Sequence, residues 1–174
     1  VPALAALFLL GHYVTSVSET DRTALTRQAE KYLGSEGTRL VETERKGAYL
    51  AALCTDDNGS WCMCVFDRDK VFKDRWVAGG GTPNLRAGEL GSWNFGDPRE
   101  AVIILCGGDL PEEAACYTFQ NGGVTYICPV QDRQVLDVFL LPENGDTVSH
   151  QLKLLDMEGQ PLDGHIAGAA AWVP

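Results

Sequence analysis

Residues 49–66 have the sequence YLAALCTDDNGSWCMCVF. Two apolar runs, 49–54 and 61–66, flank a polar segment that contains Asn58-Gly59. Such runs on either side of residues that tolerate a positive φ predict two antiparallel strands joined as a hairpin. A two-residue turn would place Cys54 opposite Met63, and a three-residue loop would place Cys54 opposite Cys62. The loop length therefore decides whether these two thiols can meet.

The hairpin pattern recurs downstream. Segments 117–120 and 124–129 enclose Asn121-Gly122-Gly123, and segments 134–141 and 147–156 enclose a turn at 142–146. The wholly apolar run 101–106 predicts a central strand. Residues 73–97 contain a glycine triplet and a proline, and we expect a long loop there with one short strand near 90–95.

A helix is expected before the strands. From residue 18 to Gly34, apolar side chains recur at helical spacing with charged residues between them. The predicted fold class is therefore α+β, with an N-terminal helix followed by a mostly antiparallel β-sheet of about seven to eight strands. Residues 18–174 are expected to form a single α+β domain.

The first seventeen residues form a segment of a different kind. Residues 1–10, VPALAALFLL, carry no polar side chain. A bilayer core about 30 Å thick needs about 20 apolar residues, so the segment is too short to cross it alone. We interpret residues 1–17 as the outer end of a truncated transmembrane anchor, because the stretch offers no solvent face. The alternative is an N-terminal helix packed in the core.

Composition and cysteine spacing argue against nucleic-acid binding and against a zinc site. The chain has 174 residues and a formal net charge of -10, which disfavours nucleic acid as a partner because phosphate contacts require clustered Lys and Arg. Its six cysteines lack the spacing of zinc knuckles, and Cys62 and Cys64 fall within a predicted strand. We expect no cofactor and no metal site, and at most one or two disulfides.

One segment contrasts with the acidic composition. Residues 65–81 concentrate basic side chains next to aromatic residues and the glycine triplet, whose backbone amides could form an anion-binding nest. We therefore expect any binding of a small anionic ligand to use Lys73, Arg75, Trp76, Gly79, Gly80 and Gly81. The alternative, which the local sequence favours, is that the aromatic residues pack while the basic residues pair with Asp67, Asp69 and Asp74.

No catalytic residue is predicted, although one thiol arrangement is considered. Cys106 ends an apolar strand just before Gly107-Gly108, a context that could lower the pKa of a thiol. A small hydrolase or thiol enzyme using Cys106 and His150 is therefore the alternative function. Sequence alternation places His150 on a predicted core face, which favours a structural histidine.

The chain resembles the uncharacterised single-pass, membrane-anchored extracytoplasmic domains of Gram-positive gut bacteria. The resemblance rests on the apolar start and short helix together with YLAAL at 49–53, Cys64-Val65-Phe66, Phe72-Lys73-Asp74-Arg75, the glycine triplet and Leu136-Asp137-Val138-Phe139. It implies a cell-membrane location through the N-terminal segment and an outward-facing domain, without an activity. Together with the absence of catalytic motifs, it leads us to expect a non-enzymatic module that binds a protein or a small anionic ligand.

Overall fold

The computed structural model of the chain describes residues 2–97, 100–121, 123–142 and 151–167. Two helices come first, α1 (Pro2–Thr15) and α2 (Arg22–Leu33), with the short strand β1 (Val17–Ser18) between them. The other strands are β2 (Arg39–Lys46), β3 (Tyr49–Thr55), β4 (Trp61–Arg68), β5 (Arg75–Leu85), β6 (Leu90–Asp97), β7 (Glu100–Gly107), β8 (Cys116–Asn121), β9 (Val124–Pro129), β10 (Val135–Pro142) and β11 (Lys153–Leu155).

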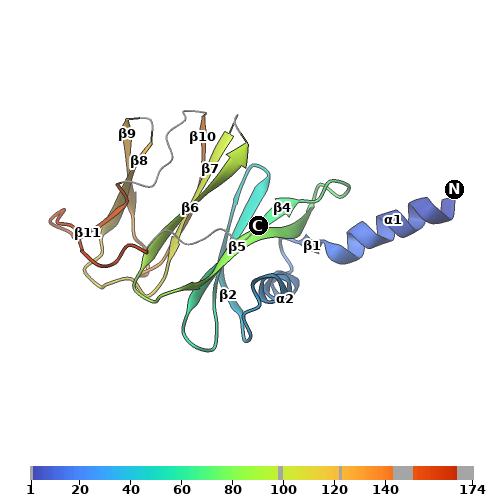
Figure 1. Ribbon diagram of the computed structural model, residues 1–174, viewed down its shortest axis with the longest axis horizontal. Coiled ribbons are helices and arrows are strands. Elements are labelled where there is room, and N and C mark those ends of the chain that lie inside the picture. Colours follow the sequence, from blue (N-terminus) through green and yellow to red (C-terminus); the bar gives the residue numbers. More distant parts are fainter. Residues whose placement is uncertain (1, 98–99, 122, 143–150, 168–174) are drawn as a thin grey trace.

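The strands form three antiparallel sheets (Figure 1). The first sheet has the order β1-β5-β4-β3-β2, the second β10-β7-β6 and the third β11-β8-β9. The α+β class and the antiparallel pairing are confirmed. The expectation of one sheet of seven to eight strands is wrong, because the described residues hold eleven strands in three sheets.

Strand β7 explains why the sheets stack as layers. Val102 and Ile104 face the core shared with the first sheet, while Ile103 and Leu105 face the core shared with the third. A strand that is apolar on both faces must be covered on both faces. The second sheet therefore lies between the other two, and β7 is the central strand predicted at 101–106.

Helix α2 covers the remaining face of the first sheet. Asp21 accepts a hydrogen bond from the amide of Ala24 at its N-terminus, and Gly34 adopts a left-handed conformation at its C-terminus. Leu25 and Ala29 are buried against the first sheet. The amphipathic helix expected between residues 18 and 34 is confirmed.

The first hairpin contains the three-residue loop. Asp56 donates its amide to the Ser60 carbonyl, and Gly59 has a φ of 76°. A glycine at this left-handed position closes a type I turn with a bulge. Cys54 therefore lies directly opposite Cys62.

Two predictions about the downstream strands are wrong. Residues 73–97 are not a long loop, because they contain all of β5 and β6, although the strand expected near 90–95 is present within β6. Of the predicted hairpin across 142–146, residues 143–150 lie outside the described residues. The described parts of its two strands do not pair with each other, because β10 pairs with β7 and β11 pairs with β8. The hairpin at 117–129 is confirmed as β8 and β9.

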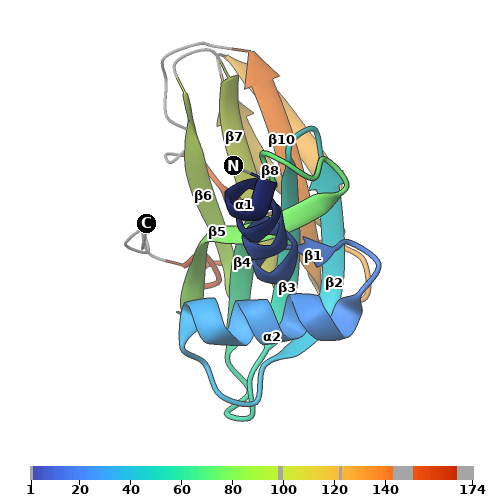
Figure 2. The ribbon, with the colours of Figure 1, turned by 90° about the vertical axis from the view of Figure 1, so that its right-hand side faces the viewer.

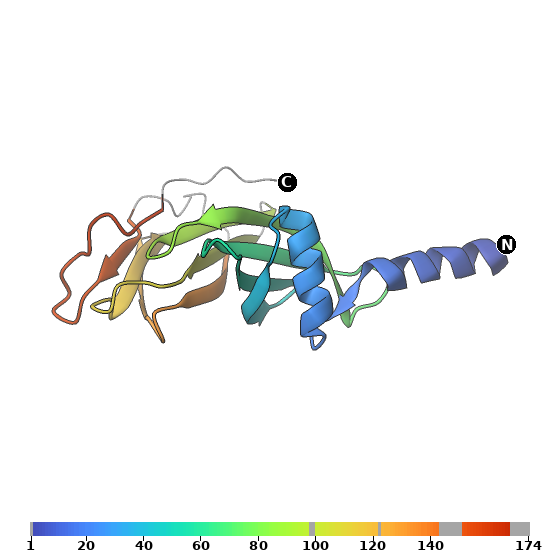
Figure 3. The ribbon, with the colours of Figure 1, turned by 90° about the horizontal axis from the view of Figure 1, so that it is seen from below.

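Helix α1 projects away from the sheets. Figures 1 and 3 show it extending from the end of the molecule that carries α2. Figure 2, which shows α1 nearly end-on, places α2 crosswise at its base. The division between a segment 1–17 and a domain 18–174 stays a prediction.

Candidate functional site

The six residues predicted to bind an anion lie in β5, between Arg75 and Gly81, and just before this strand. Lys73 is exposed on the connection between β4 and β5, and the other five residues belong to β5. Trp76 is buried in the core beneath α2. The structure therefore replaces the expected open loop by a strand that pairs with β4, and ligand binding by these residues stays a prediction.

The glycines of β5 have a packing role. A Cβ atom on Gly81 would lie 2.5 Å from the Met63 carbonyl oxygen and 2.7 Å from Cδ2 of Leu33. A Cβ on Gly79 would lie 2.3 Å from a carboxylate oxygen of Asp67. Neither glycine has the left-handed φ that an anion-binding nest uses. Close approach of β5 to β4 and α2 is thus the reason for glycine at position 81.

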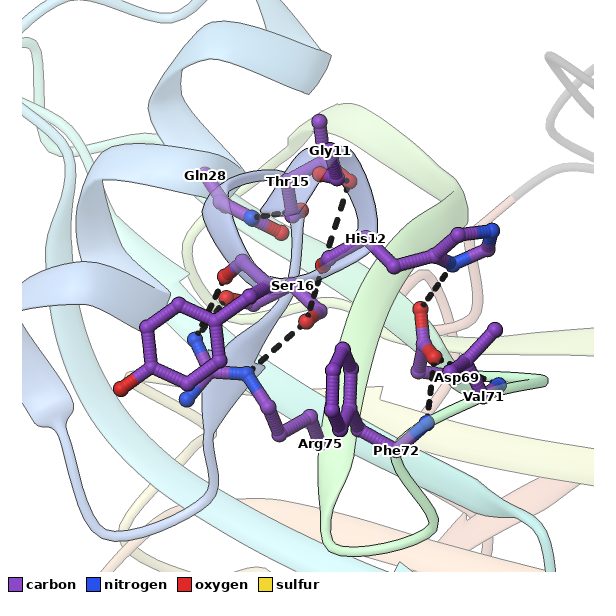
Figure 4. Close-up of polar contacts among 10 residues, drawn as sticks. Gly11, His12, Thr15, Ser16, Gln28, Asp69, Val71, Phe72 and Arg75 are labelled. Atoms are coloured by element: carbon purple, nitrogen blue, oxygen red, sulfur yellow. Dashed lines mark hydrogen bonds and ion pairs between the residues drawn. The ribbon is translucent and has the colours of Figure 1, made fainter. Parts of the chain in front are cut away.

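Arg75 binds the C-terminal end of α1 (Figure 4). Its Nε donates to the Ser16 hydroxyl at 2.9 Å, and its Nη2 donates to the Tyr13 carbonyl at 3.0 Å and to the Ser16 carbonyl. Its guanidinium carbon also lies 4.1 Å from the centre of the Tyr13 ring. Carbonyls at a helix C-terminus lack helical partners and attract cations, so Arg75 caps α1 instead of pairing with the neighbouring aspartates.

Asp69 makes the second connection to α1. Its Oδ1 accepts hydrogen bonds from the amides of Val71 and Phe72 at 2.7 Å, and its Oδ2 lies 2.9 Å from Nδ1 of His12. The Asp69 side chain is only 2% exposed. Burial opposes ionisation, but the bonds from His12, Phe72 and Val71 outweigh it and hold the pKa of Asp69 below its usual value.

A groove lies where α1, α2 and β5 meet. It has a volume of about 440 Å³ and is lined by Val14, Thr15, Arg27, Gln28, Lys31, Tyr32 and Ala78. Gln28 connects the three elements, because its Nε2 donates to the Thr15 carbonyl at 2.7 Å and its Oε1 accepts from the Ala78 amide at 3.3 Å. The groove therefore has an apolar lining, two basic side chains and a fixed geometry.

The apolar side chains of α1 are exposed. Fractional exposure runs from 45% at Leu9 to 73% at Leu4 among Leu4, Leu7, Phe8, Leu9, Leu10, Tyr13 and Val14. Four of these are consecutive, and successive residues of a helix point about 100° apart, so apolar surface surrounds the helix. In the described parts of the chain, neither helix is long and apolar enough to cross a membrane.

A polar pocket lies at a separate place, between β2, β9 and β10. It has a volume of about 340 Å³, and its lining includes Glu42, Cys128 and Asp137. Tyr117 donates its hydroxyl to Oδ2 of Asp137 at 2.5 Å. No motif in the sequence indicated this pocket, whose lining brings Glu42 of β2 to residues between 128 and 139.

Glu44 lies on the same strand as Glu42 and contacts β10. Its Oε2 accepts a hydrogen bond from the Val138 amide at 2.8 Å. Burial, assisted by the negative charge of Asp137, raises the pKa of Glu44 to about 7, against the lowering effect of the Val138 bond. This carboxyl can therefore exchange a proton near neutral pH.

The structure removes support for a thiol enzyme at Cys106. The side chain is completely buried, and burial raises the pKa of its thiol, which is the opposite of what a nucleophile requires. His150 lies outside the described residues. All six cysteines are free thiols, and the described residues contain no cluster of ligands that could hold a metal ion.

Comparisons of the chain with protein-family models, with curated proteins and with solved structures give no match.

Proposed function

We propose that the chain is a membrane-anchored extracytoplasmic interaction module in which α1 lies in lipid and the stacked sheets stand at the membrane surface. The observation that carries this proposal is the apolar surface all round α1, with Leu7, Phe8 and Leu10 each more than half exposed. A helix that is apolar on every side is stable in lipid or inside a protein. No other described element covers these side chains of α1.

The junction at the base of α1 supports the same function. Arg75 and Asp69 both hold α1, from the start of β5 and from the connection before it. Tyr13 and His12 lie at this junction, where aromatic and amphipathic side chains suit the interface between lipid and water. A docked helix, unlike a flexible linker, would give the sheets one orientation relative to the bilayer.

The surface for a partner protein is proposed at the opposite end. Strand β9 is an edge of the third sheet, and its sequence VTYICP has no charged residue. Val124 and Ile127 on this strand are 54% and 69% exposed. Uncharged edge strands can pair with an extended segment of another chain. We therefore assign partner binding to β9, away from α1 (Figure 1).

Lipid contact by α1 can be tested with a tryptophan probe. Phe8→Trp places the probe on α1, and Met157→Trp places a control at an exposed site beyond β11. The fluorescence of the added tryptophan is the emission of each variant minus that of the unsubstituted chain. In vesicles of brominated phosphatidylcholine, this fluorescence should be quenched for Phe8→Trp and should not be quenched for Met157→Trp. Equal emission of Phe8→Trp in brominated and ordinary vesicles would contradict the proposal.

The side of the membrane and the partner surface need separate tests. A membrane-impermeant amine reagent should label Lys153 in intact cells, because this side chain is exposed. Labelling only after lysis would place the domain on the cytoplasmic side.

A photo-crosslinking residue at Ile127 should form a defined adduct in cells, whereas one at exposed Asn58 should not. The same adducts from both positions would exclude β9 as a specific surface.

A further inference from the structure

The groove between α1 and α2 has the features of a site for a phosphate ester. Arg27 and Lys31 lie four residues apart on α2, so their side chains share one face of the helix. Both are exposed, and in the described part of the chain neither takes part in an ion pair. A guanidinium can bind two phosphate oxygens at once, and an ammonium adds a point charge.

The acidic residue between them does not neutralise the pair. Oε1 of Glu30 accepts a hydrogen bond at 3.0 Å from the amide of Gly37, which lies beyond the C-terminal end of α2. Among the described residues, Arg27 and Lys31 are therefore two neighbouring positive charges without an acidic partner. Charge therefore favours an anionic occupant of this groove.

The apolar part of the lining identifies the kind of anion. Val14, Ala78 and the Tyr32 ring contribute carbon surface next to the two basic groups. Free phosphate would leave this surface empty, whereas the glycerol and first acyl carbons of a lipid would cover it. A volume of about 440 Å³ lies within the range of small-molecule sites.

The position of the groove agrees with a lipid occupant. Val14 and Thr15 belong to the last turn of α1, and α2 runs crosswise at this end (Figures 2 and 3). If α1 enters the bilayer as proposed above, the groove lies at the level of the headgroups. We propose that Arg27 and Lys31 bind the phosphate of an anionic phospholipid in this groove, an inference that rests on the proposed function.

The test compares binding of the full chain to vesicles of phosphatidylcholine alone and of phosphatidylcholine with phosphatidylglycerol. The unsubstituted chain should bind the anionic vesicles more tightly. In the double variant Arg27→Ala/Lys31→Ala, the ratio of affinities for the anionic and the neutral vesicles should fall at least tenfold. The control Arg86→Ala/Lys153→Ala removes the same charge from exposed sites outside the groove and should keep the preference.

A charge-conserving variant separates a defined site from general attraction. Arg27→Lys keeps the charge but loses the paired hydrogen bonds, so it should lose part of the preference. Equal losses in the two double variants, or no loss in Arg27→Lys, would overturn the groove as the site. Soluble glycerol phosphate should compete only weakly, and strong competition would assign the groove to a free phosphate ester instead of a lipid.

The two proposals fail in different ways. Quenching of Trp at position 8 without any preference for anionic vesicles would overturn the lipid phosphate site and leave the membrane anchor in place. Absence of quenching in both kinds of vesicle would overturn the anchor and with it the proposed occupant of the groove.

Discussion

Arg75 and Ser16, which are 59 residues apart in the sequence, are joined by a hydrogen bond of 2.9 Å from Nε of Arg75 to the hydroxyl of Ser16. The same guanidinium bonds the carbonyls of Tyr13 and Ser16. One side chain at the start of β5 thus satisfies the end of α1 and fixes the chain that leads into β1.

Arg75→Ala should loosen α1 without unfolding the sheets. Hydrogen bonds to a charged group each contribute about 1.5–3 kcal/mol, and the alanine side chain restores none of them. We expect the Ser16 amide, which bonds the His12 carbonyl, to exchange hydrogen at least ten times faster. Lys73→Ala is the matched control, because Lys73 is exposed nearby, and it should change neither exchange nor melting temperature appreciably. Unchanged exchange in Arg75→Ala would contradict the capping role.

Asp69→Asn should weaken the junction at neutral pH. Asparagine keeps an oxygen for the amides of Val71 and Phe72 but loses the charge that faces His12. Because folding lowers the pKa of Asp69, its contribution is fully present above its unfolded value of about 3.9 and is lost as pH falls through the lower folded value. The stability difference between the two proteins should therefore shrink below about pH 4. Urea unfolding over a pH series measures it, and a difference that persists in acid would assign the effect to packing.

Glu44→Gln should stabilise the protein above neutral pH. Folding raises the pKa of Glu44 from 4.5 to about 7, so ionisation opposes folding progressively between these values. Glutamine cannot ionise, and its carbonyl can still accept the Val138 amide. The advantage of Glu44→Gln in melting temperature should therefore be small near pH 4, grow up to about pH 7 and then level off. Glu158→Gln, at an exposed turn, is a control that should show no such trend.

The six thiols should react in two groups. Cys54, Cys62, Cys64 and Cys106 are buried, whereas Cys116 and Cys128 are partly exposed. Under native conditions an alkylating reagent should modify the last two first, because thiol reactivity requires access as well as ionisation. In denaturant all six should react. Mass spectrometry counts the modified thiols under both conditions. Early modification of Cys62 would contradict the packing beneath α2.

Features that depend on neighbouring residues could be predicted from the sequence. The hairpin at 49–66 follows from a turn between two apolar runs, and α2 follows from its apolar spacing and from Gly34 at its end. Strand β7 was recognised because it is apolar on both faces. Each of these signals is contained within about twenty residues.

Features that depend on distant partners could not be predicted. The pairing of β11 with β8, instead of β10, joins Lys153 to Thr118 and leaves no local signal. The cluster of basic residues at 68–75 predicted an anion-binding site, but only the fold shows that Arg75 contacts α1. Likewise, Glu44 meets Val138 across 94 residues, so its raised pKa could not be anticipated.

The glycine triplet illustrates how one composition fits two structures. Glycine suits an open anion-binding loop and also a strand that packs too closely for a side chain. Gly81 belongs to the second kind, because its Cβ would meet the Met63 carbonyl and the Leu33 side chain of α2.

Gly81→Ala should therefore destabilise the domain. The backbone of β4 cannot yield as a flexible side chain would, so α2 and β5 must move apart, and overpacking of this kind costs about 1–3 kcal/mol. The matched control is Gly11→Ala, since a Cβ there would meet nothing within 4 Å and alanine favours a helix. Urea unfolding should show a loss of stability for Gly81→Ala and none for Gly11→Ala. If Gly81→Ala instead kept full stability but weakened anion binding, the glycine would belong to a ligand site, and the packing explanation would be wrong.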